Sequence, residues 1–562
     1  MSQDTDVRAA DPVLGRLAEA ILIPPFPGLS APGWMLDALG RGLAGVTLFG
    51  QNISAPDQVS ALTATLRSAV SGDDPVIAID EEGGDVTRVA YADGSPYPGN
   101  AALGAVDDVA LTQAVSRAIG ADLAALGINF DLAPCADVLG TADSPAVGTR
   151  SFGADTGLVS RHTAAAVAGL QGACVAACTK HFPGHGRTGT DSHEAIATIE
   201  GGLADLRLVD LPPFEAAIRA GTLAIMPSHL RVPELTGDLP ATVSAAAITG
   251  LLRGELGYTG VIVSDALEMR ATRDRFGIPG AAVLAVAAGT DLLCLGRDGS
   301  EDDYLAVRDA LVAAVRDGAL DGERLEEAAD RVARLRGGLA RARSAAPVGD
   351  SAGPGVGLGI GPAVGLVAAR RAVRISGPHR MLSHPVIIEV EPRENIAAGR
   401  FGWGLAPWAP AGSVHRVSAS GRLLNGAGLG LADPARSGPA DSGPADGGPA
   451  DVGQADGGSA DGDRADGDRA DNGAADGDRV DAAGILAAAA GRSLVAVVRD
   501  AHRDEQTRSL VSALLAARPD LILVEMGLPF WRPPEGTSYL VTYGASRASA
   551  HAAAELLGLG SA

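Results

Sequence analysis

The feature that most constrains the fold of this chain is an alternation of short apolar segments with helical stretches over residues 17–345. Continuous apolar segments are typical of parallel strands that are buried on both faces. Amphipathic or Ala-rich stretches, such as residues 157–172 and 243–256, lie between them. Eight such units predict an α/β fold of the (β/α)8 barrel type. The eight predicted strands are 20–26, 45–50, 75–84, 128–138, 175–182, 223–230, 260–269 and 290–296.

Unusual polar residues gather at the carboxyl ends of these predicted strands. They are Asp80, Lys180 with His181, His229 and Asp265. Loops are polar in general, but loop polarity alone does not predict charged residues at the strand ends. In a (β/α)8 barrel the carboxyl ends of the strands carry the active site. The pattern therefore predicts that the active site lies at this end of the barrel.

The chain has 562 residues, which is too long for one hydrophobic core. Three further apolar segments, 492–502, 519–527 and 538–544, indicate a second, smaller α/β domain. A Gly/Pro/Ser-rich segment precedes that domain and is typical of a linker. We expect a flexible N-terminus (1–14), the barrel (15–345), a linker (346–357), a C-terminal α/β sandwich domain (358–432 and 483–562) and a low-complexity insertion within it (433–482).

The insertion repeats a five-residue unit in which an Asp recurs from Asp441 to Asp481. A pentapeptide β-helix would need a Leu or Phe beside each Ala-Asp pair, and this tract has none. With nothing to bury, it is predicted to be disordered. The Asp array could also bind calcium, but the apolar position of a calcium β-roll is missing as well.

The net charge and the composition of individual segments limit which classes of partner the protein can have. The net charge of −23 disfavours nucleic acids and anionic membranes as partners. No stretch reaches eighteen apolar residues, and the first residues lack the basic region and apolar run of a signal peptide. We therefore expect a cytoplasmic protein without a membrane partner, and take a monomer as the working expectation. The four cysteines form no CxxC pair, which disfavours a zinc ribbon or redox pair.

The segment TKHFPGHGRTGTDSHEAI (179–196) holds three of the ten histidines. His181 and His185 have the spacing of a helical zinc pair, but Pro183 and Gly184 between them oppose a helix. The Glu of the usual H-E-x-x-H zinc motif is also absent. We therefore predict no metal and no other cofactor, and assign His185 a role in shaping the loop.

A catalytic interpretation suits this segment better. Asp191 lies two residues before His193, and a carboxylate beside an imidazole can fix its tautomer and support its protonated form. Asp265, at another strand end, can act as a nucleophile. The combination suits displacement at an acetal carbon, which retaining glycosidases usually perform with two carboxylates. Asp80, Arg88, Arg150 and Lys180 would bind sugar hydroxyls.

Four ordered motifs, IDEEGGDVTR, GTRSFG, KHFPGHGRTGTDSH and VIVSDALEM, resemble those of the β-N-acetylglucosaminidases of glycoside hydrolase family 3. The resemblance covers residues 15–345. It implies that Asp265 is the nucleophile, that His193 is the acid/base and that Asp191 orients His193. It also implies that the terminal sugar is bound by Asp80, Arg88, Arg150, Lys180 and His181.

The chain departs from the family pattern in one motif. That motif usually reads Asp-Gln-Glu-Gly-Gly-Arg, whereas this chain has Glu81 in place of the Gln and Asp85 in place of the Arg. We expect the two added negative charges to change the rim of the site. Residues 358–562 are similar to the second domain of actinobacterial-type family members. In that branch the catalytic groups come from the barrel, so the second domain is either structural or borders the cleft.

The expected function is that of an exo-acting, retaining β-N-acetylglucosaminidase. Its substrate would be a carbohydrate with a non-reducing terminal N-acetylglucosamine, such as a peptidoglycan fragment. Two enzymatic alternatives stay open. A neutral imidazole does not repel phosphate, so the enzyme could be an N-acetylglucosaminide phosphorylase, and it could also accept β-glucosides. A non-enzymatic sugar-binding scaffold is a further alternative, against which the complete set of Asp265, His193 and Asp191 argues.

Overall fold

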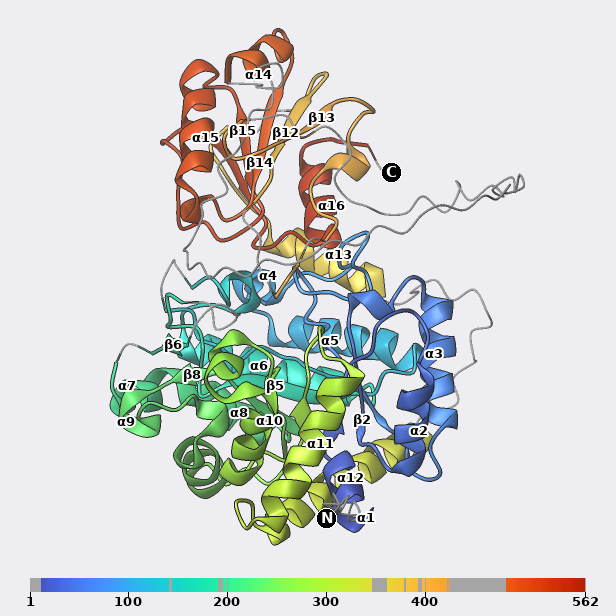
Figure 1. The fold of residues 1–562 in the computed structure, drawn as a ribbon. Helices are drawn as coiled ribbons and strands as arrows, with labels where there is room; N and C mark the ends of the chain where they lie inside the picture. The colour runs from blue at the N-terminus through green and yellow to red at the C-terminus, as the bar shows by residue number, and fades with distance from the viewer. Residues whose placement is uncertain are drawn as a thin grey trace, which may run out of the picture.

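The computed structural model describes residues 12–140, 144–190, 196–199, 201–345, 361–378, 381–392, 397–399, 401–421, 424 and 482–560. The chain forms a barrel and a smaller α/β domain that is stacked on one end of it (Figure 1). The predicted low-complexity insertion and linker lie outside the described residues, apart from Ala482 at the insertion's end.

All eight predicted barrel strands are confirmed, and all are parallel. Six form one continuous sheet and two form a second, short sheet. A bridge between Val263 and Leu292 joins the two sheets on one side. The hydrogen bond from Thr47 N to Pro24 O (3.3 Å) joins them on the other, which closes the ring. In ring order the strands are β1 (Leu22–Ile23), β2 (Gly45–Leu48), β3 (Val76–Ile79), β4 (Phe130–Asp131), β5 (Ala176–Phe182), β7 (Ala224–Pro227), β9 (Val261–Ile262) and β10 (Leu293–Cys294).

Helices cover the outside of the ring. Asp108, Asp155 and Ser300 cap three of them by accepting hydrogen bonds from the first helical turn. The predicted helix 157–172 is α6, whereas 243–256 becomes η5, which has π-helical hydrogen bonding. The helices are α1 (Pro12–Glu19), α2 (Gly33–Arg41), α3 (Pro56–Ser68), α4 (Asn100–Val106), α5 (Val109–Ala125), α6 (Thr156–Gln171), α7 (Leu203–Asp205), η3 (Leu206–Asp210), α8 (Leu211–Arg219), α9 (Pro233–Thr236), η5 (Ala246–Glu255), α10 (Arg270–Ala288), α11 (Glu301–Arg316) and α12 (Gly322–Ala345).

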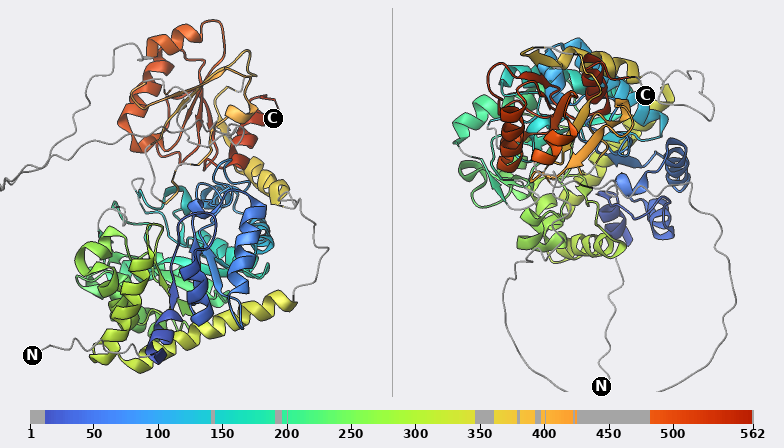
Figure 2. Two further views of the ribbon diagram at one scale, coloured as in Figure 1. Left: turned by 45° about the vertical axis from the view of Figure 1, so that its right-hand side comes forward. Right: turned by 90° about the horizontal axis from the view of Figure 1, so that it is seen from above.

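Helices α11 and α12 are separated by a turn in which Gly318 has a φ of 73°. Helix α12 runs across the amino-terminal end of the barrel, opposite the second domain (Figure 2). Two very short strands, β6 (Ala197–Thr198) and β8 (Leu230–Arg231), pair beside the ring and were not predicted, because two residues carry no detectable periodicity.

The second domain is a three-layer α/β sandwich. Its sheet has the order β11-β16-β15-β14-β12-β13 and is parallel except for the edge strand β11. One face is covered by α14 and α15, and the other by α16 with residues 398–399 and 401–408. The elements are α13 (Gly361–Ala372), β11 (Arg374–Ser376), β12 (Val386–Val390), η6 (Ala406–Trp408), β13 (Val414–Val417), α14 (Ala482–Ala488), β14 (Leu494–Val498), η8 (Ala501–Arg503), α15 (Glu505–Ala517), β15 (Ile522–Glu525), β16 (Ser538–Val541) and α16 (Arg547–Leu556).

The carboxyl ends of this second sheet face the carboxyl ends of the barrel strands. The strand order reverses between β12 and β14, and such a switch point opens a crevice at the carboxyl ends of a parallel sheet. Here the barrel loop that follows β3 occupies this region, and its Val86 is buried in the core of the second domain. Helix α13 lies between the domains and contacts α4, α5 and α16 (Figure 1).

Within the described residues no single helix is long and apolar enough to cross a membrane. One bent pair, Pro233–Val243 with Ala246–Glu255, meets the length and composition criteria only when its two halves are combined.

Candidate active site

A cavity of about 920 Å³ opens where the barrel strands end. Six of the eight residues predicted from the sequence line it, although they come from separate segments of the chain. They are Asp80, Arg88, Arg150, Lys180, His181 and Asp265. Residues 397–399 of the second domain line the same cavity, so this domain borders the cleft.

Lys180 is the centre of a buried charge cluster. Its Nζ lies 2.6 Å from Asp80 Oδ1 and 2.8 Å from Glu82 Oε1. Glu82 in turn forms a bidentate ion pair with Arg150. Arg150 Nε lies 2.9 Å from Glu82 Oε2, and Arg150 Nη2 lies 2.7 Å from Glu82 Oε1. Such a bidentate pair fixes the plane of the guanidinium group. The cluster thus presents two cations and two carboxylates in one defined arrangement.

These contacts decide the protonation states of the cluster. Burial alone would raise the pKa of the Glu82 carboxyl, but Arg150 and Lys180 outweigh burial and hold this pKa well below its usual range. Burial alone would lower the Lys180 pKa, but Asp80 and Glu82 raise it above the usual lysine value. Both groups are therefore charged at neutral pH, which suits binding of sugar hydroxyls rather than proton transfer.

His181 is oriented by Asp137. The distance from His181 Nδ1 to Asp137 Oδ2 is 2.7 Å, and Asp137 is completely buried. The other carboxylate oxygen accepts hydrogen bonds from the backbone N–H groups of His181 and His185. Because Nδ1 donates its proton to Asp137, Nε2 is the ring atom that faces Arg150, and it lies 3.2 Å from Arg150 Nη2.

His185 shapes the loop, which agrees with the role assigned from the sequence. It is buried, its Nδ1 lies 3.1 Å from Thr188 Oγ1, and its ring meets that of His181 edge-on.

One group of potential metal ligands lies behind the cavity. Cys135, Asp137 and His181 place one ligand atom each within 4.8 Å of one another. Cys135 Sγ donates to Asp137 Oδ2 at 3.1 Å, so the thiol and the imidazole share one carboxylate oxygen. Burial raises the pKa of the Cys135 thiol far above its usual value, which disfavours the thiolate that a metal needs. The three groups are better described as a hydrogen-bonded support for His181.

Asp265 lies three residues after the end of β9 and lines the cavity. The backbone N–H of Ala266 donates to Asp265 Oδ1 (2.8 Å), and His229 Nε2 lies 2.9 Å from the Ala266 carbonyl oxygen. His229 is therefore a backbone support beneath Asp265. Glu268 also lines the cavity, where it accepts a hydrogen bond from Gly296 N, and desolvation raises its pKa.

Arg88 lies between the two domains. One of its Nη atoms is 2.8 Å from the carbonyl oxygen of Ala397 in the second domain and 3.9 Å from Asp80 Oδ2. Glu81 holds the Arg88 loop from beneath, because its Oε2 accepts from the backbone N–H groups of Arg88 and Val89.

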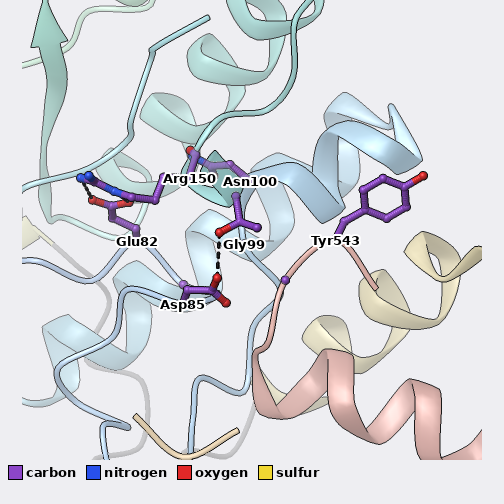
Figure 3. Close-up of a pocket in the computed structure, with 9 residues that line it drawn as sticks. Glu82, Asp85, Gly99, Asn100, Arg150 and Tyr543 are labelled. Atoms are coloured by element: carbon purple, nitrogen blue, oxygen red, sulfur yellow. Dashed lines mark hydrogen bonds and ion pairs between the residues drawn. The ribbon is translucent and has the colours of Figure 1, made fainter. Parts of the chain in front are cut away.

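The expectation that Glu81 and Asp85 add charge to the rim of the site is wrong. Both residues are buried, at 5% and 4% exposure. Glu81 is turned into its own loop, and Asp85 points into the domain interface (Figure 3). The glycines between these residues explain the geometry, since Gly84 has a φ of 61° and a Cβ there would lie 2.5 Å from Gly99 Cα.

The predicted acid/base pair, Asp191 and His193, lies outside the described residues. The chain just before them is anchored by the ion pair of Arg187 with the buried Asp210. The roles of Asp191 and His193 remain predictions.

Sequence reasoning did not name several charged residues of the cavity and its support, among them Glu82, Asp137 and Glu268. Signals for these three were present. Asp137 lies near the end of the fourth predicted strand, Glu82 lies in the same motif as Asp80, and Glu268 lies in the same motif as Asp265.

A closed (β/α)8 ring with paired carboxylates and cations around an open cavity at its carboxyl end is compatible with a glycoside hydrolase, although the same fold carries other activities. The sequence comparison agrees, because residues 38–335 match the N-terminal domain of glycosyl hydrolase family 3. The chain belongs to this family, as its motifs predicted.

Known relatives are similar over part or all of the chain. The β-hexosaminidase A of Pseudoalteromonas piscicida is 32% identical over 336 residues, which are 55% of this chain and 56% of that protein. The β-hexosaminidase LpqI of Mycobacterium tuberculosis is 34% identical over 51% of this chain and 74% of its own length. A family 3 β-N-acetylglucosaminidase structure from Paenibacillus sp. FPU-7 is similar over 97% of this chain and 96% of its own, with 28% identity and a TM-score of 0.77. The structural likeness thus includes the second domain.

Proposed function

We propose that this chain is an exo-acting, retaining β-N-acetylglucosaminidase that removes a non-reducing terminal N-acetylglucosamine from β-linked glycans. The observation that carries the proposal is the convergence of the five predicted sugar-binding residues and Asp265 on one cavity. The names of the relatives from P. piscicida, M. tuberculosis and Paenibacillus support the substrate class.

The terminal sugar is bound by charged groups deep in the cavity. Asp80 and Glu82 accept hydrogen bonds from sugar hydroxyls, while Lys180, Arg150 and the Nε2 side of His181 complete the set. Lys180 and Glu82 are already paired and desolvated, so the site binds a sugar without first burying new charges.

The reaction has two steps. In the first, the Asp265 carboxylate attacks the anomeric carbon, and protonated His193 donates its proton to the glycosidic oxygen, so that the rest of the glycan departs as an alcohol. In the second, neutral His193 takes a proton from water, the water oxygen bonds to the anomeric carbon and Asp265 is released. Asp191 holds His193 in the required orientation throughout.

Hydrolysis of nitrophenyl β-N-acetylglucosaminide by the wild type and by Asp265→Ala tests the assignment. Loss of the nucleophile should lower kcat by at least about 10³-fold. Equal rates for the two proteins would contradict the proposal and favour the sugar-binding scaffold. Intact-protein mass spectrometry during turnover should also show a covalent N-acetylglucosaminyl adduct that is absent from Asp265→Ala.

Phosphorolysis is the second candidate reaction, because a neutral His193 would not repel phosphate as a carboxylate would. The same assay with and without phosphate distinguishes the two reactions. Sugar 1-phosphate among the products would make the enzyme a phosphorylase, and free sugar alone would leave it a hydrolase. A β-glucoside in the same panel tests the broader specificity.

Peptidoglycan fragments are the proposed natural substrates, and the cytoplasm is the proposed location. Release of N-acetylglucosamine from purified fragments checks the first proposal. Fractionation of cells that express the full chain checks the second.

A further inference from the structure

Asp85, on the barrel loop after β3, connects the two domains at a single carboxylate. Its Oδ2 accepts a hydrogen bond from Thr149 Oγ1 at 2.7 Å and pairs with Arg499 Nη2 at 3.0 Å. Its Oδ1 accepts from the backbone N–H of Ala545 at 2.7 Å. The carboxylate therefore binds a barrel residue, the end of β14 and the start of the turn before α16.

The ion pair at this point is buried on both sides. The side chain of Arg499 is 8% exposed and that of Asp85 is 2% exposed. The Arg499 guanidinium also lies 5.0 Å from the ring centre of Phe401 in its own domain. Removing either partner would leave a desolvated charge, so the two residues hold each other in position.

Thr149 immediately precedes Arg150 in η2 (Gly148–Arg150), the short helical turn that delivers Arg150 to the cavity. A second arginine of the C-terminal domain contacts the same segment. Arg503 donates from its Nη atoms to the carbonyl oxygens of Ser144 and Pro145. It also lies against Gly148, where a Cβ would come within 3.0 Å of Arg503 Nη2.

The two domains approach each other closely behind Arg150. A cavity of about 10 Å³, room for one water molecule, is lined by Glu82, Asp85 and Arg150 from the barrel and by Tyr543 and Gly544 from the C-terminal domain (Figure 3). The Glu82–Arg150 pair thus shares this small cavity with Tyr543 and Gly544 of the second domain.

We propose that the C-terminal domain positions the sugar-binding Arg150, with Asp85 and Arg499 as the positioning residues. The ion pair with Arg499 holds the Asp85 carboxylate in position, and this carboxylate accepts the hydrogen bond that holds Thr149. Thr149 in turn holds the helical turn from which Arg150 reaches Glu82. Since sugar binding by Arg150 belongs to the proposed function, this inference rests on it. It extends that function, because it makes an α/β domain without catalytic groups part of the substrate-binding site.

Kinetics of Asp85→Asn, Thr149→Val and Arg499→Met in the full chain test the inference. Thr149→Val removes one hydrogen bond without leaving a buried charge, so it remains informative if a charge variant folds poorly. Each variant should lower kcat/KM on nitrophenyl β-N-acetylglucosaminide by about tenfold, mainly through KM, because a small displacement of a positioning group is costly. The double variant Asp85→Asn/Arg499→Met should lose little more than either single one.

The matched control is Arg416→Met, which breaks the ion pair of Arg416 with the buried Glu389 inside the C-terminal domain; neither residue lines the cavity. It should lower the melting temperature yet leave kcat/KM within about twofold. If the three interface variants also lose only thermal stability, the interface is merely structural and the inference is overturned.

Calorimetric binding of free N-acetylglucosamine separates this inference from the proposed function. If the wild type binds the sugar but does not cleave the glycoside, the proposed reaction fails, and weaker binding by the interface variants still supports the inference. If the wild type and all interface variants bind N-acetylglucosamine with equal affinity, the inference is contradicted, whether or not the protein is an active enzyme.

Discussion

Lys180 carries a charge at a position where its side chain is 3% exposed, and it is stable there only because Asp80 and Glu82 lie within 2.8 Å. The same holds for Arg150 beside Glu82. Glu82 is the one carboxylate that both cations share. The arrangement at the base of the cavity therefore depends most on this residue.

Glu82→Gln should lower the unfolding free energy by about 3–5 kcal/mol, because it leaves two buried cations with too little negative charge. It should also raise KM, since Arg150 and Lys180 lose their shared anchor. Chemical denaturation and steady-state kinetics measure the two effects. The control Glu215→Gln removes an exposed partner of Arg219 and should cost less than about 1 kcal/mol.

The pH dependence of this effect has a defined sign. The pKa of Glu82 is lower in the folded state than its ordinary value of 4.5, so its stabilisation is present above that value and is lost as the pH falls toward the folded pKa. The wild type should therefore lose stability on acidification below about pH 4.5 more steeply than Glu82→Gln. Parallel stability curves for the two proteins would contradict the charge assignment.

Asp137→Asn should lower kcat/KM by about 10–100-fold, because an amide has only one acceptor oxygen, whereas Asp137 uses one oxygen for His181 Nδ1 and the other for two backbone N–H groups. Cys135→Ala removes a weaker donor to the same oxygen and should cost less than about fivefold. Steady-state kinetics of both variants check this order. Equal losses would show that the thiol is as important as the carboxylate in orienting His181.

For single residues, the sequence predicted which cavity residues lie at strand ends. It did not predict the side chains that pair with them and stabilise their charges. Asp80, Lys180 and Asp265 follow apolar segments, and that position is visible in the sequence. Whether Glu82 or Glu81 faces the cavity depends on two glycines with positive φ, which no periodicity reveals. The orientation of Asp85 depends on Arg499, which is 414 residues away in the chain.

At the scale of elements, the alternation of strands and helices was sufficient to predict the barrel, because each strand is buried on both faces and reads as an apolar segment. The predicted segments are longer than the strands. The segment 128–138, for example, contains β4 with only two residues, although the chain beyond β4 still pairs with β5 through the Cys135–Lys180 bridge and the hydrogen bond from Lys180 N to Pro134 O. The apolar residues beyond the regular strand are buried as well, so the sequence pattern does not show where the regular strand ends.

The amino-terminal end of the barrel is held together by Asp291. This buried carboxylate accepts from Arg253 on η5 and from Arg324 and Arg331 on α12, with distances of 2.6 Å and 3.1 Å for the latter two. One side chain thus attaches two outer helices to the segment that leads into β10. The contact lies at the end of the barrel away from the cavity.

Asp291→Ala should therefore lower the unfolding free energy by about 3–5 kcal/mol while leaving kcat/KM of the folded enzyme unchanged. Denaturant unfolding and activity at low temperature measure the two effects. Asp309→Ala, which removes an exposed partner of Arg308, serves as control and should cost less than about 1 kcal/mol. A loss of activity in folded Asp291→Ala would mean that the two ends of the barrel communicate.

At the scale of the whole molecule, two domains with separate cores share one cavity. The barrel supplies the charged groups, while the C-terminal domain supplies a wall at 397–399 and the contacts around Asp85. The sequence indicated both domains and left open whether the second one borders the cleft. The interface could not be predicted, because it joins residues with no periodic or local relation.

The low-complexity tract is predicted to contribute nothing to either core. Replacing residues 433–481 by a flexible linker of about twelve residues should leave kcat/KM within about twofold. Closing a shorter loop costs less entropy, so the unfolding free energy should rise by about 1 kcal/mol. Thermal unfolding and the glycosidase assay check both expectations. A large loss of activity would instead assign the tract a role at the cavity.

The contact between Asp85 and Ala545 spans 460 residues of the chain. During synthesis the ribosome completes the barrel, with Asp85 and Arg150 in place, long before it reaches Ala545. A nascent or prematurely terminated chain therefore exposes a finished barrel whose Asp85 carboxylate has neither Arg499 nor Ala545 to bind. The order of translation makes the contacts around Asp85 form late, because they need Arg499 and Ala545.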